Sequence, residues 1–238
     1  GNTNRCSIYN EIGFTQDGAI AEEIRVPDFL LHKINNNVSD ESALLVEPAS
    51  VVTQGLLKDN PRSNLKVLVI GEGTIGLLAA TIVREFHPSK VVMLGLKKNQ
   101  VELAFKSGID QYFTNPSKIR EKFDLIIECS GAMVAIQNAF KLCARGGSFL
   151  LLGYTESPES YLLQVDDLIN NDQSIFASFG YSRKAWLDVV AKLNNGSLDL
   201  TFVVSHQFKL KDWENAISTM KTNDQPRGKV SIRITEGK

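Results

Sequence analysis

The chain has 238 residues, of which 43% are hydrophobic and 22% are charged, so it can bury a full core and is not of the intrinsically disordered class. Its 26 basic and 27 acidic side chains give a net charge of −1, which argues against electrostatic binding to nucleic acid or to membranes. No apolar run approaches the ~20 residues that span a bilayer, and the first residues lack the pattern of a secretory signal. The three scattered cysteines do not form a disulfide framework, so we expect a cytoplasmic protein.

Short apolar runs alternate with helical patterns from residue 66 onward. Strands are expected at Val67–Ile70, Val91–Leu94, Gln111–Phe113, Phe123–Glu128, Ser148–Leu152 and Ser174–Phe179. Helices are expected at Thr74–Phe86, Asn99–Ser107, Ala132–Ala144 and Leu162–Ile169. This alternation predicts an α/β fold of the Rossmann type, in which helices cover both faces of a doubly wound parallel sheet.

Two features frame the last part of this pattern. The helix over Ala132–Ala144 is expected to end at Arg145-Gly146-Gly147, a cation followed by glycine. After Phe179 we expect a helix at Ser182–Leu193, a strand at Phe202–Val204, a helix at Lys211–Thr222 and a strand at Lys229–Ile234.

A glycine-rich loop, Gly71-Glu72-Gly73-Thr74-Ile75-Gly76, lies between the first strand and the first helix. In such a loop Gly71 permits a tight turn, Gly73 lets the backbone approach a pyrophosphate, and Gly76 lets the helix pack closely on the strand. The helix N-terminus then faces the anion. The position between strand and helix makes this a fairly strong signal for a dinucleotide site.

The end of the next strand lacks the acidic residue that grips the ribose 2′-hydroxyl of NAD. Gly95 stands there instead, followed by Leu96, Lys97 and Lys98. These lysines could be the solvated start of a helix, but a cation at a helix N-terminus opposes the helix dipole unless an anion lies nearby. We therefore expect a 2′-phosphate contact, chiefly from Lys97, and NADP(H) in preference to NAD(H).

Several segments, taken in order, resemble one enzyme family. They are Asp17–Glu22, similar to the start of a strand in that family, Val38–Ala43 with Leu45–Pro48, the loop Gly71–Gly76, Phe123–Gly131, Gly146–Gly153 and Arg227–Val230. The family is that of the zinc-dependent medium-chain dehydrogenases/reductases, in particular its sorbitol, threonine and glucose dehydrogenase branch. The likeness covers nearly the whole chain.

The resemblance implies three parts. Residues 1–48 would be a remnant of a β-rich, GroES-like catalytic domain, residues 49–181 the NAD(P)-binding Rossmann domain, and residues 182–238 a segment returning to the catalytic domain. The zinc-bearing domain with which family members begin does not precede Gly1. We therefore expect a shortened chain that is inactive by itself, with zinc belonging to the intact parent protein.

The resemblance also implies site residues. Glu47 matches a glutamate that reaches the catalytic zinc directly or through its water, and we favour this role over that of a helix-end carboxylate near a domain junction. Further cofactor contacts are expected at Cys129, Leu152, Gly153, Ser178 and Phe179, through the backbone and with the Cys129 thiol in the core. Arg183 would reach the cofactor phosphates or be a surface cation. No catalytic residue can be named.

The expected function is NADP(H)-linked hydride transfer between a small secondary alcohol, polyol or sugar and its carbonyl form. The alternative is a dinucleotide-binding module or subunit without turnover. A zinc-free quinone reductase-like protein is a weaker third possibility, against which Glu47-Pro48 argues. In the family the strand matching Ser174–Phe179 commonly pairs across a dimer, so we expect a homo-dimer or homo-tetramer.

Overall fold

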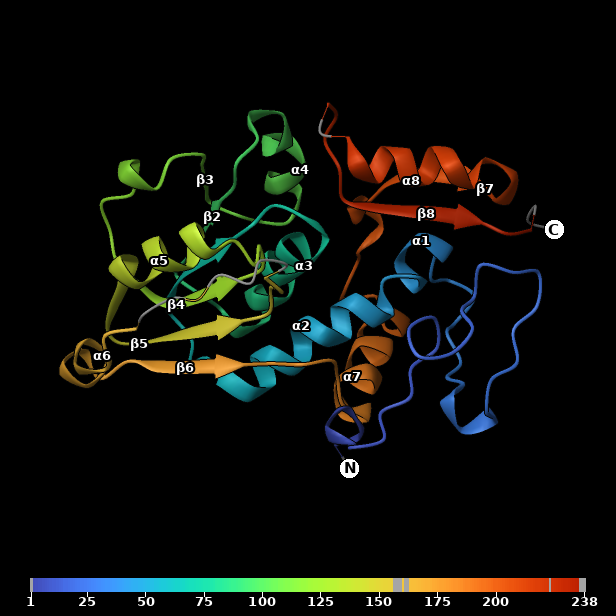
Figure 1. Ribbon diagram of the computed structural model, residues 1–238, viewed down its shortest axis with the longest axis horizontal. Helices are drawn as coiled ribbons and strands as arrows, with labels where there is room; N and C mark the ends of the chain where they lie inside the picture. The colour runs from blue at the N-terminus through green and yellow to red at the C-terminus, as the bar shows by residue number, and fades with distance from the viewer. Residues whose placement is uncertain (1, 156–159, 161–162, 223, 236–238) are drawn as a thin grey trace.

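The centre of the molecule is a six-stranded parallel sheet with the strand order β3-β2-β1-β4-β5-β6 (Figure 1). The computed structural model describes residues 2–155, 160, 163–222 and 224–235. The strands are β1 (Lys66–Ile70), β2 (Lys90–Leu94), β3 (Gln111–Phe113), β4 (Phe123–Glu128), β5 (Cys143–Leu151) and β6 (Ser174–Ala177). This is the doubly wound order of dinucleotide-binding folds, so the prediction of a Rossmann-type α/β fold is confirmed.

Helices cover both faces of this sheet because successive side chains of each strand point to opposite sides. Val67 and Val69 of β1 face one core, while Leu68 and Ile70 face the other. The helices on the first face are α2 (Val46–Asp59), α3 (Thr74–Val83), α4 (Val101–Lys106) and α7 (Arg183–Asn194). The second face is covered by α5 (Met133–Leu142), and α6 (Val165–Asn171) precedes β6.

Helix α2 has no counterpart among the expected elements. Pro48 is tolerated in its first turn, where a backbone N–H would lack a helical partner, and Asn60 ends the helix in the left-handed conformation. A Cβ at Gly55 would lie 2.9 Å from a methyl carbon of Leu152, so glycine lets α2 approach the end of β5 closely.

The expected boundary between α5 and β5 was wrong. The helix ends at Leu142 and the strand begins at Cys143, so that Arg145, Gly146 and Gly147 lie within the strand. Gly146 has a φ of +70°, and the β4–β5 pairing shifts register between Phe123 and Leu125. The two glycines therefore form an irregularity in the strand and do not end the helix.

The last part of the chain forms a separate two-stranded parallel sheet of β7 (Val204–Lys209) and β8 (Lys229–Arg233), beside α8 (Trp213–Lys221). The strand expected at Phe202–Val204 was misplaced, because Thr201–Val203 is a 3₁₀ turn and the strand follows it. The helix expected at Leu162–Ile169 is observed at Val165–Asn171, and residue 162 lies outside the described part.

The first 45 residues contain little regular structure in the described part. The 3₁₀ turns η1 (Thr3–Arg5) and η2 (Asp28–Leu30) and the helix α1 (Asp40–Ala43), capped by the Ser39 hydroxyl, are separated by loops. The strand that the resemblance implied at Asp17–Glu22 is absent from these described residues, whose one bridge joins Ile12 and Gln16.

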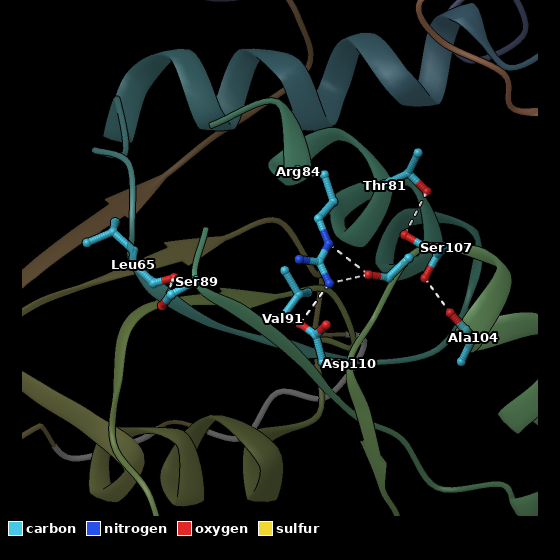
Figure 2. Close-up of polar contacts among 9 residues, drawn as sticks. Leu65, Thr81, Arg84, Ser89, Val91, Ala104, Ser107 and Asp110 are labelled. Carbon is cyan, nitrogen blue, oxygen red and sulfur yellow. Dashed lines mark hydrogen bonds and ion pairs between the residues drawn. The ribbon is translucent and has the colours of Figure 1, made fainter. Parts of the chain in front are cut away.

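The edge of the sheet at which the strands begin is closed by ion pairs and hydrogen bonds. Arg84, in the 3₁₀ turn after α3, donates from Nε to the Gly108 carbonyl at 2.7 Å and from Nη2 to the Asp110 carboxylate at 2.7 Å (Figure 2). Asp110 also accepts a hydrogen bond from the Val91 backbone N–H at 2.7 Å. These contacts fix the turn before β3 and hence the position of Tyr112, the middle residue of that strand. None of the helices in the described part is long and apolar enough to cross a bilayer.

Candidate functional site at the carboxyl edge of the sheet

The glycine-rich loop has the geometry that a phosphate site needs. Gly71 has a φ of +102°, and a Cβ at Gly76 would overlap the Gly71 carbonyl, so both positions require glycine. A Cβ at Gly73 would meet no atom within 4 Å, so the space in front of this residue is open. Helix α3 starts at Thr74, and its first-turn N–H groups, which lack helical acceptors, point toward that space.

Two cavities lie at this edge of the sheet and share part of their walls. The first has a volume of about 300 Å³ and is lined by Ile70, Leu94, Gly95, Thr114, Pro116, Ala132, Val134, Ala135 and Asn138, among others. The second has a volume of about 440 Å³ and is lined by Gly73, Thr74, Lys97, Cys129, Arg227, Gly228, Lys229 and Val230, among others. The residues common to both are Gly71, Glu72, Leu96 and Ser130. The first cavity is largely apolar, whereas the second places cations opposite the glycine loop.

The carboxylate of Glu72 lies at the end of β2, between the two cavities. Its Oε1 accepts hydrogen bonds from the backbone N–H groups of Leu96 at 2.9 Å and Lys97 at 3.1 Å. A Cβ at Gly95 would lie 2.7 Å from Glu72 Oε2 and would overlap the Tyr112 hydroxyl. The Glu72 side chain therefore takes the place of the missing side chain at Gly95.

The groups around Glu72 hold this arrangement in place. The Tyr112 hydroxyl donates to the Lys97 carbonyl at 2.8 Å, and burial, together with the Glu72 charge, raises the pKa of Tyr112 above its ordinary value. The amide of Gln100, 2% exposed, donates to the Glu72 carbonyl at 2.9 Å and to the Arg227 carbonyl at 2.7 Å. The end of β2 is thereby connected to both the glycine loop and the segment before β8.

Sequence reasoning missed Glu72, although a signal for it existed. Strands β1 and β2 pair in parallel, with Ile70 beside Leu94. Two residues beyond this pair, Glu72 in the loop after β1 lies beside Leu96, which follows β2. The expected position for the acid is the end of the second strand, whereas Glu72 lies in the loop after the first strand.

A second buried carboxylate, Glu128, organises the loop after β4. Its Oε1 accepts hydrogen bonds from the Ser130 N–H at 2.7 Å and the Gly131 N–H at 3.0 Å. The neighbouring Cys129 lines the second cavity, and burial raises the pKa of its thiol, with a further contribution from the Glu128 charge. Leu152 and Gly153 donate their N–H groups to the Glu128 carbonyl, so they lie beside this loop.

The predicted cofactor residues fall into three groups. Those that line the cavities are Gly71, Gly73, Thr74, Gly95, Leu96, Lys97 and Cys129. Those that support the loops from behind are Ile75, Gly76, Leu152 and Gly153. Those that lie beyond the lining residues of both cavities are Ser178, Phe179 and Arg183. Phe179 packs against Tyr9 with ring centroids 5.4 Å apart, and Arg183 is exposed in the first turn of α7.

Glu47, the predicted metal residue, lies exposed in the first turn of α2. The pKa of Glu47 is raised above its ordinary value. The main cause is desolvation of the carboxyl; the Lys229 ammonium opposes this shift and the Glu11 carboxylate adds to it. Burial and the Glu47 charge in turn raise the pKa of Tyr181 to about 12. Among the described residues, no group of three or more His, Cys, Asp or Glu side chains could hold a metal ion. A catalytic zinc needs about three protein ligands, so the described residues do not fit a zinc site.

Comparisons with known proteins agree with the fold and identify the family. The sequence profile of a family described as zinc-binding dehydrogenase matches residues 74–195, more than half of the chain. A sorbitol dehydrogenase of Halalkalibacterium halodurans is 28% identical over 94% of this chain and 68% of its own length. An L-threonine 3-dehydrogenase of Paraburkholderia phytofirmans is 28% identical over 99% of this chain and 70% of its own length.

Solved structures of the same class have this fold. An alcohol dehydrogenase of Escherichia coli, complexed with NADH, superposes with a TM-score of 0.87 at 24% identity, over 97% of this chain and 70% of its own. A protein of Sinorhizobium meliloti described as a zinc-binding dehydrogenase, bound to NADP, gives a TM-score of 0.87 at 20% identity, over 95% and 70%.

The glycine loop, the parallel sheet and the profile match support the same conclusion, and the predicted family is confirmed: the chain belongs to the zinc-binding dehydrogenase family of oxidoreductases acting on CH–OH groups.

Proposed function

We propose that this chain binds a nicotinamide dinucleotide at the carboxyl edge of its sheet and serves hydride transfer between a small secondary alcohol, polyol or sugar and its carbonyl form. The observation that carries the proposal is the open space at Gly73, which lies beside the first turn of α3 and lines the second cavity. The cofactors bound to the two structural neighbours and the substrates named for the two curated relatives support it.

The two cavities would bind different parts of the dinucleotide. The N–H groups of Thr74 and Ile75 would hold the pyrophosphate, because a helix N-terminus favours an anion. Lys229, which lines the second cavity, supplies a positive charge on the opposite side. The largely apolar first cavity suits the adenine ring. When bound, the nicotinamide supplies the site that accepts or donates the hydride.

The finer expectation, a preference for NADP(H), rests on Gly95 and Lys97 and stays a prediction. Lys97 lines the second cavity, where a 2′-phosphate would meet its charge. The Glu72 carboxylate lies at the same end of β2 and favours the opposite choice. The cofactor preference therefore depends on which of these two groups acts on the ribose.

A dinucleotide-binding module without turnover remains the second candidate. It is favoured by one observation: Glu47 has too few potential metal ligands near it among the described residues to hold zinc. The two candidates differ in activity and share the binding site.

We also propose that β6 pairs with a second copy of the chain. It forms the outer edge of the sheet, and Ser174, Ile175 and Ala177 are exposed. An unpaired strand edge presents backbone donors and acceptors to a partner. Light scattering after size-exclusion chromatography should give the mass of a dimer or tetramer, and Ile175→Pro, which removes an N–H that points away from β5, should reduce it.

Two experiments test the proposed function. Titration with NADH and NADPH, followed by the fluorescence of Trp186 and Trp213, should show saturable binding of at least one of them. Wild-type protein that binds neither would overturn the proposal. The second experiment measures activity and metal content. The 238-residue chain should give no NAD⁺ or NADP⁺ reduction above background with a panel of alcohols and polyols, and metal analysis should find no stoichiometric zinc. Turnover by this chain would exclude the second candidate, a dinucleotide-binding module without activity.

A further inference from the structure

We propose that Glu72 is the acid that reads the ribose of the cofactor, and that it makes the site selective for NAD(H) over NADP(H). This inference rests on the proposed dinucleotide binding. It reverses the cofactor preference that the sequence favours at Gly95 and Lys97, because the carboxylate that was missing from the end of β2 is supplied by the glycine loop.

The first argument is the position of the carboxylate. In a dinucleotide-binding fold the ribose-binding acid projects from the end of the second strand. Glu72 reaches that place from the first strand and is fixed there by the N–H groups of Leu96 and Lys97, at 2.9 and 3.1 Å. It lines both cavities, so it lies where an adenosine ribose would join a base in the first cavity to phosphates in the second.

The second argument is unused hydrogen-bonding capacity. Glu72 is only 9% exposed, and a carboxylate can accept about four hydrogen bonds. Oε1 accepts two, from the backbone N–H groups of Leu96 and Lys97, so the carboxylate keeps acceptor capacity for a ligand. Glu72 lines both cavities, and two ribose hydroxyls are suitable donors for this remaining capacity.

The third argument is that the neighbouring positions are adapted to Glu72. A Cβ at Gly95 would meet Glu72 Oε2 at 2.7 Å, so an acid at the ordinary position and Glu72 exclude each other sterically. The hydroxyl of Tyr112 closes the other side of Gly95 while it donates to the Lys97 carbonyl. The glycine at the end of β2 is thus explained by the acid beside it and gives no evidence for a 2′-phosphate.

The negative charge of Glu72 determines the selectivity between NAD(H) and NADP(H). A 2′-phosphate would bring a second negative group against a carboxylate in a largely buried place, where like charges repel more strongly than in water. The 2′-hydroxyl of NAD(H) would instead donate a charge-assisted hydrogen bond to Glu72. We expect the wild-type chain to bind NADH more tightly than NADPH by at least about tenfold, which is about 1.4 kcal/mol.

The test compares two charge-removing substitutions. Glu72→Gln keeps the size of the side chain and removes its charge, and Glu102→Gln, on the exposed face of α4 outside both cavities, is the matched control. Dissociation constants for NADH and NADPH are measured for the wild type and both variants, with adenosine 5′-monophosphate and adenosine 2′,5′-bisphosphate as probes of the adenosine end alone. Thermal unfolding reports whether each variant is folded.

The expected result is a shift of the NADH-to-NADPH preference toward NADPH by at least about tenfold in Glu72→Gln, with the preference unchanged in Glu102→Gln. A wild-type preference for NADPH overturns the inference even if Glu72→Gln does not fold. An unchanged preference in folded Glu72→Gln also overturns it, and either result leaves the proposed function standing. Binding of neither dinucleotide by the wild type overturns both.

Discussion

The two edges of the six-stranded sheet are built in opposite ways. At the edge where the strands begin, the charged groups satisfy one another: Lys66 and Lys90 pair with Glu121, and Arg84 pairs with Asp110. At the edge where the strands end, Gly73 faces open space and the Glu72 carboxylate lines both cavities. The charged groups at the first edge are paired within the chain, whereas the second edge presents groups to a ligand.

This difference gives a rule for interpreting substitutions. Groups whose hydrogen-bonding capacity is already used inside the chain contribute to folding, whereas groups left open along a cavity are available to a ligand. Substitutions at the two edges should therefore separate loss of stability from loss of cofactor binding.

The largest effect on binding is expected for Gly73→Val. The valine side chain would fill the open space that the pyrophosphate needs, so dinucleotide binding should weaken by at least about a hundredfold. No atom lies within 4 Å of a Cβ at this position, so the melting temperature should stay near that of the wild type. Gly76→Val is the contrasting variant, since its Cβ would overlap the Gly71 carbonyl and should prevent folding. Unaltered affinity in folded Gly73→Val would exclude the glycine loop as the phosphate site.

The next largest effect is expected for Gly95→Asp, which should lower both the stability of the fold and the affinity for the cofactor. Its Cβ would lie against Glu72 Oε2 and the Tyr112 hydroxyl, so we expect a loss of about 2–3 kcal/mol in the free energy of unfolding and weaker binding of both cofactors. The triple variant Gly95→Asp, Glu72→Ala, Tyr112→Phe removes both obstacles. It should recover much of the stability and prefer NADH. A single variant as stable as the wild type would show that Glu72 does not occupy this space.

The sequence predicted the strands of the main sheet and the glycine loop because these signals are local. Periodicity placed β1, β2 and β4 within a residue or two, and Gly71–Gly76 was recognised from its position between strand and helix. The position of Glu72 depends instead on the pairing of β1 with β2, which brings together residues 24 apart in the chain. The boundary between α5 and β5 was predicted wrongly for the same reason. The local sequence Arg145-Gly146-Gly147 can end a helix or form an irregularity in a strand, and only the tertiary contacts distinguish the two.

A smaller effect, on stability alone, is expected for Arg84→Ala at the opposite edge. Arg84 donates to the Gly108 carbonyl and to Asp110, so its loss leaves both acceptors without this partner (Figure 2). The free energy of unfolding should fall by about 1–3 kcal/mol. Arg84→Lys keeps the charge without the forked geometry and should recover only part of it. Cofactor affinity of the folded protein should change little, and a large change would show that the two edges are coupled through β3 and Tyr112.

The smallest effect on the free energy of unfolding is expected for Glu121→Gln. The ion pairs of Glu121 determine how this effect changes with pH. Glu121 lies 2.5 Å from Lys90 Nζ and 3.2 Å from Lys66 Nζ, and the Lys90 contact in particular holds the pKa of Glu121 below its ordinary value of 4.5. Because the pKa is lower in the folded state, the stabilisation is fully present above about pH 4.5 and is lost as the pH falls through the folded pKa. The variant should therefore be less stable than the wild type by at most about 1 kcal/mol at pH 7, and the difference should shrink in acid and in high salt. Urea unfolding of both proteins between pH 7 and pH 3 measures this difference, and a constant difference across that range would mean that Glu121 acts through packing and not through its charge.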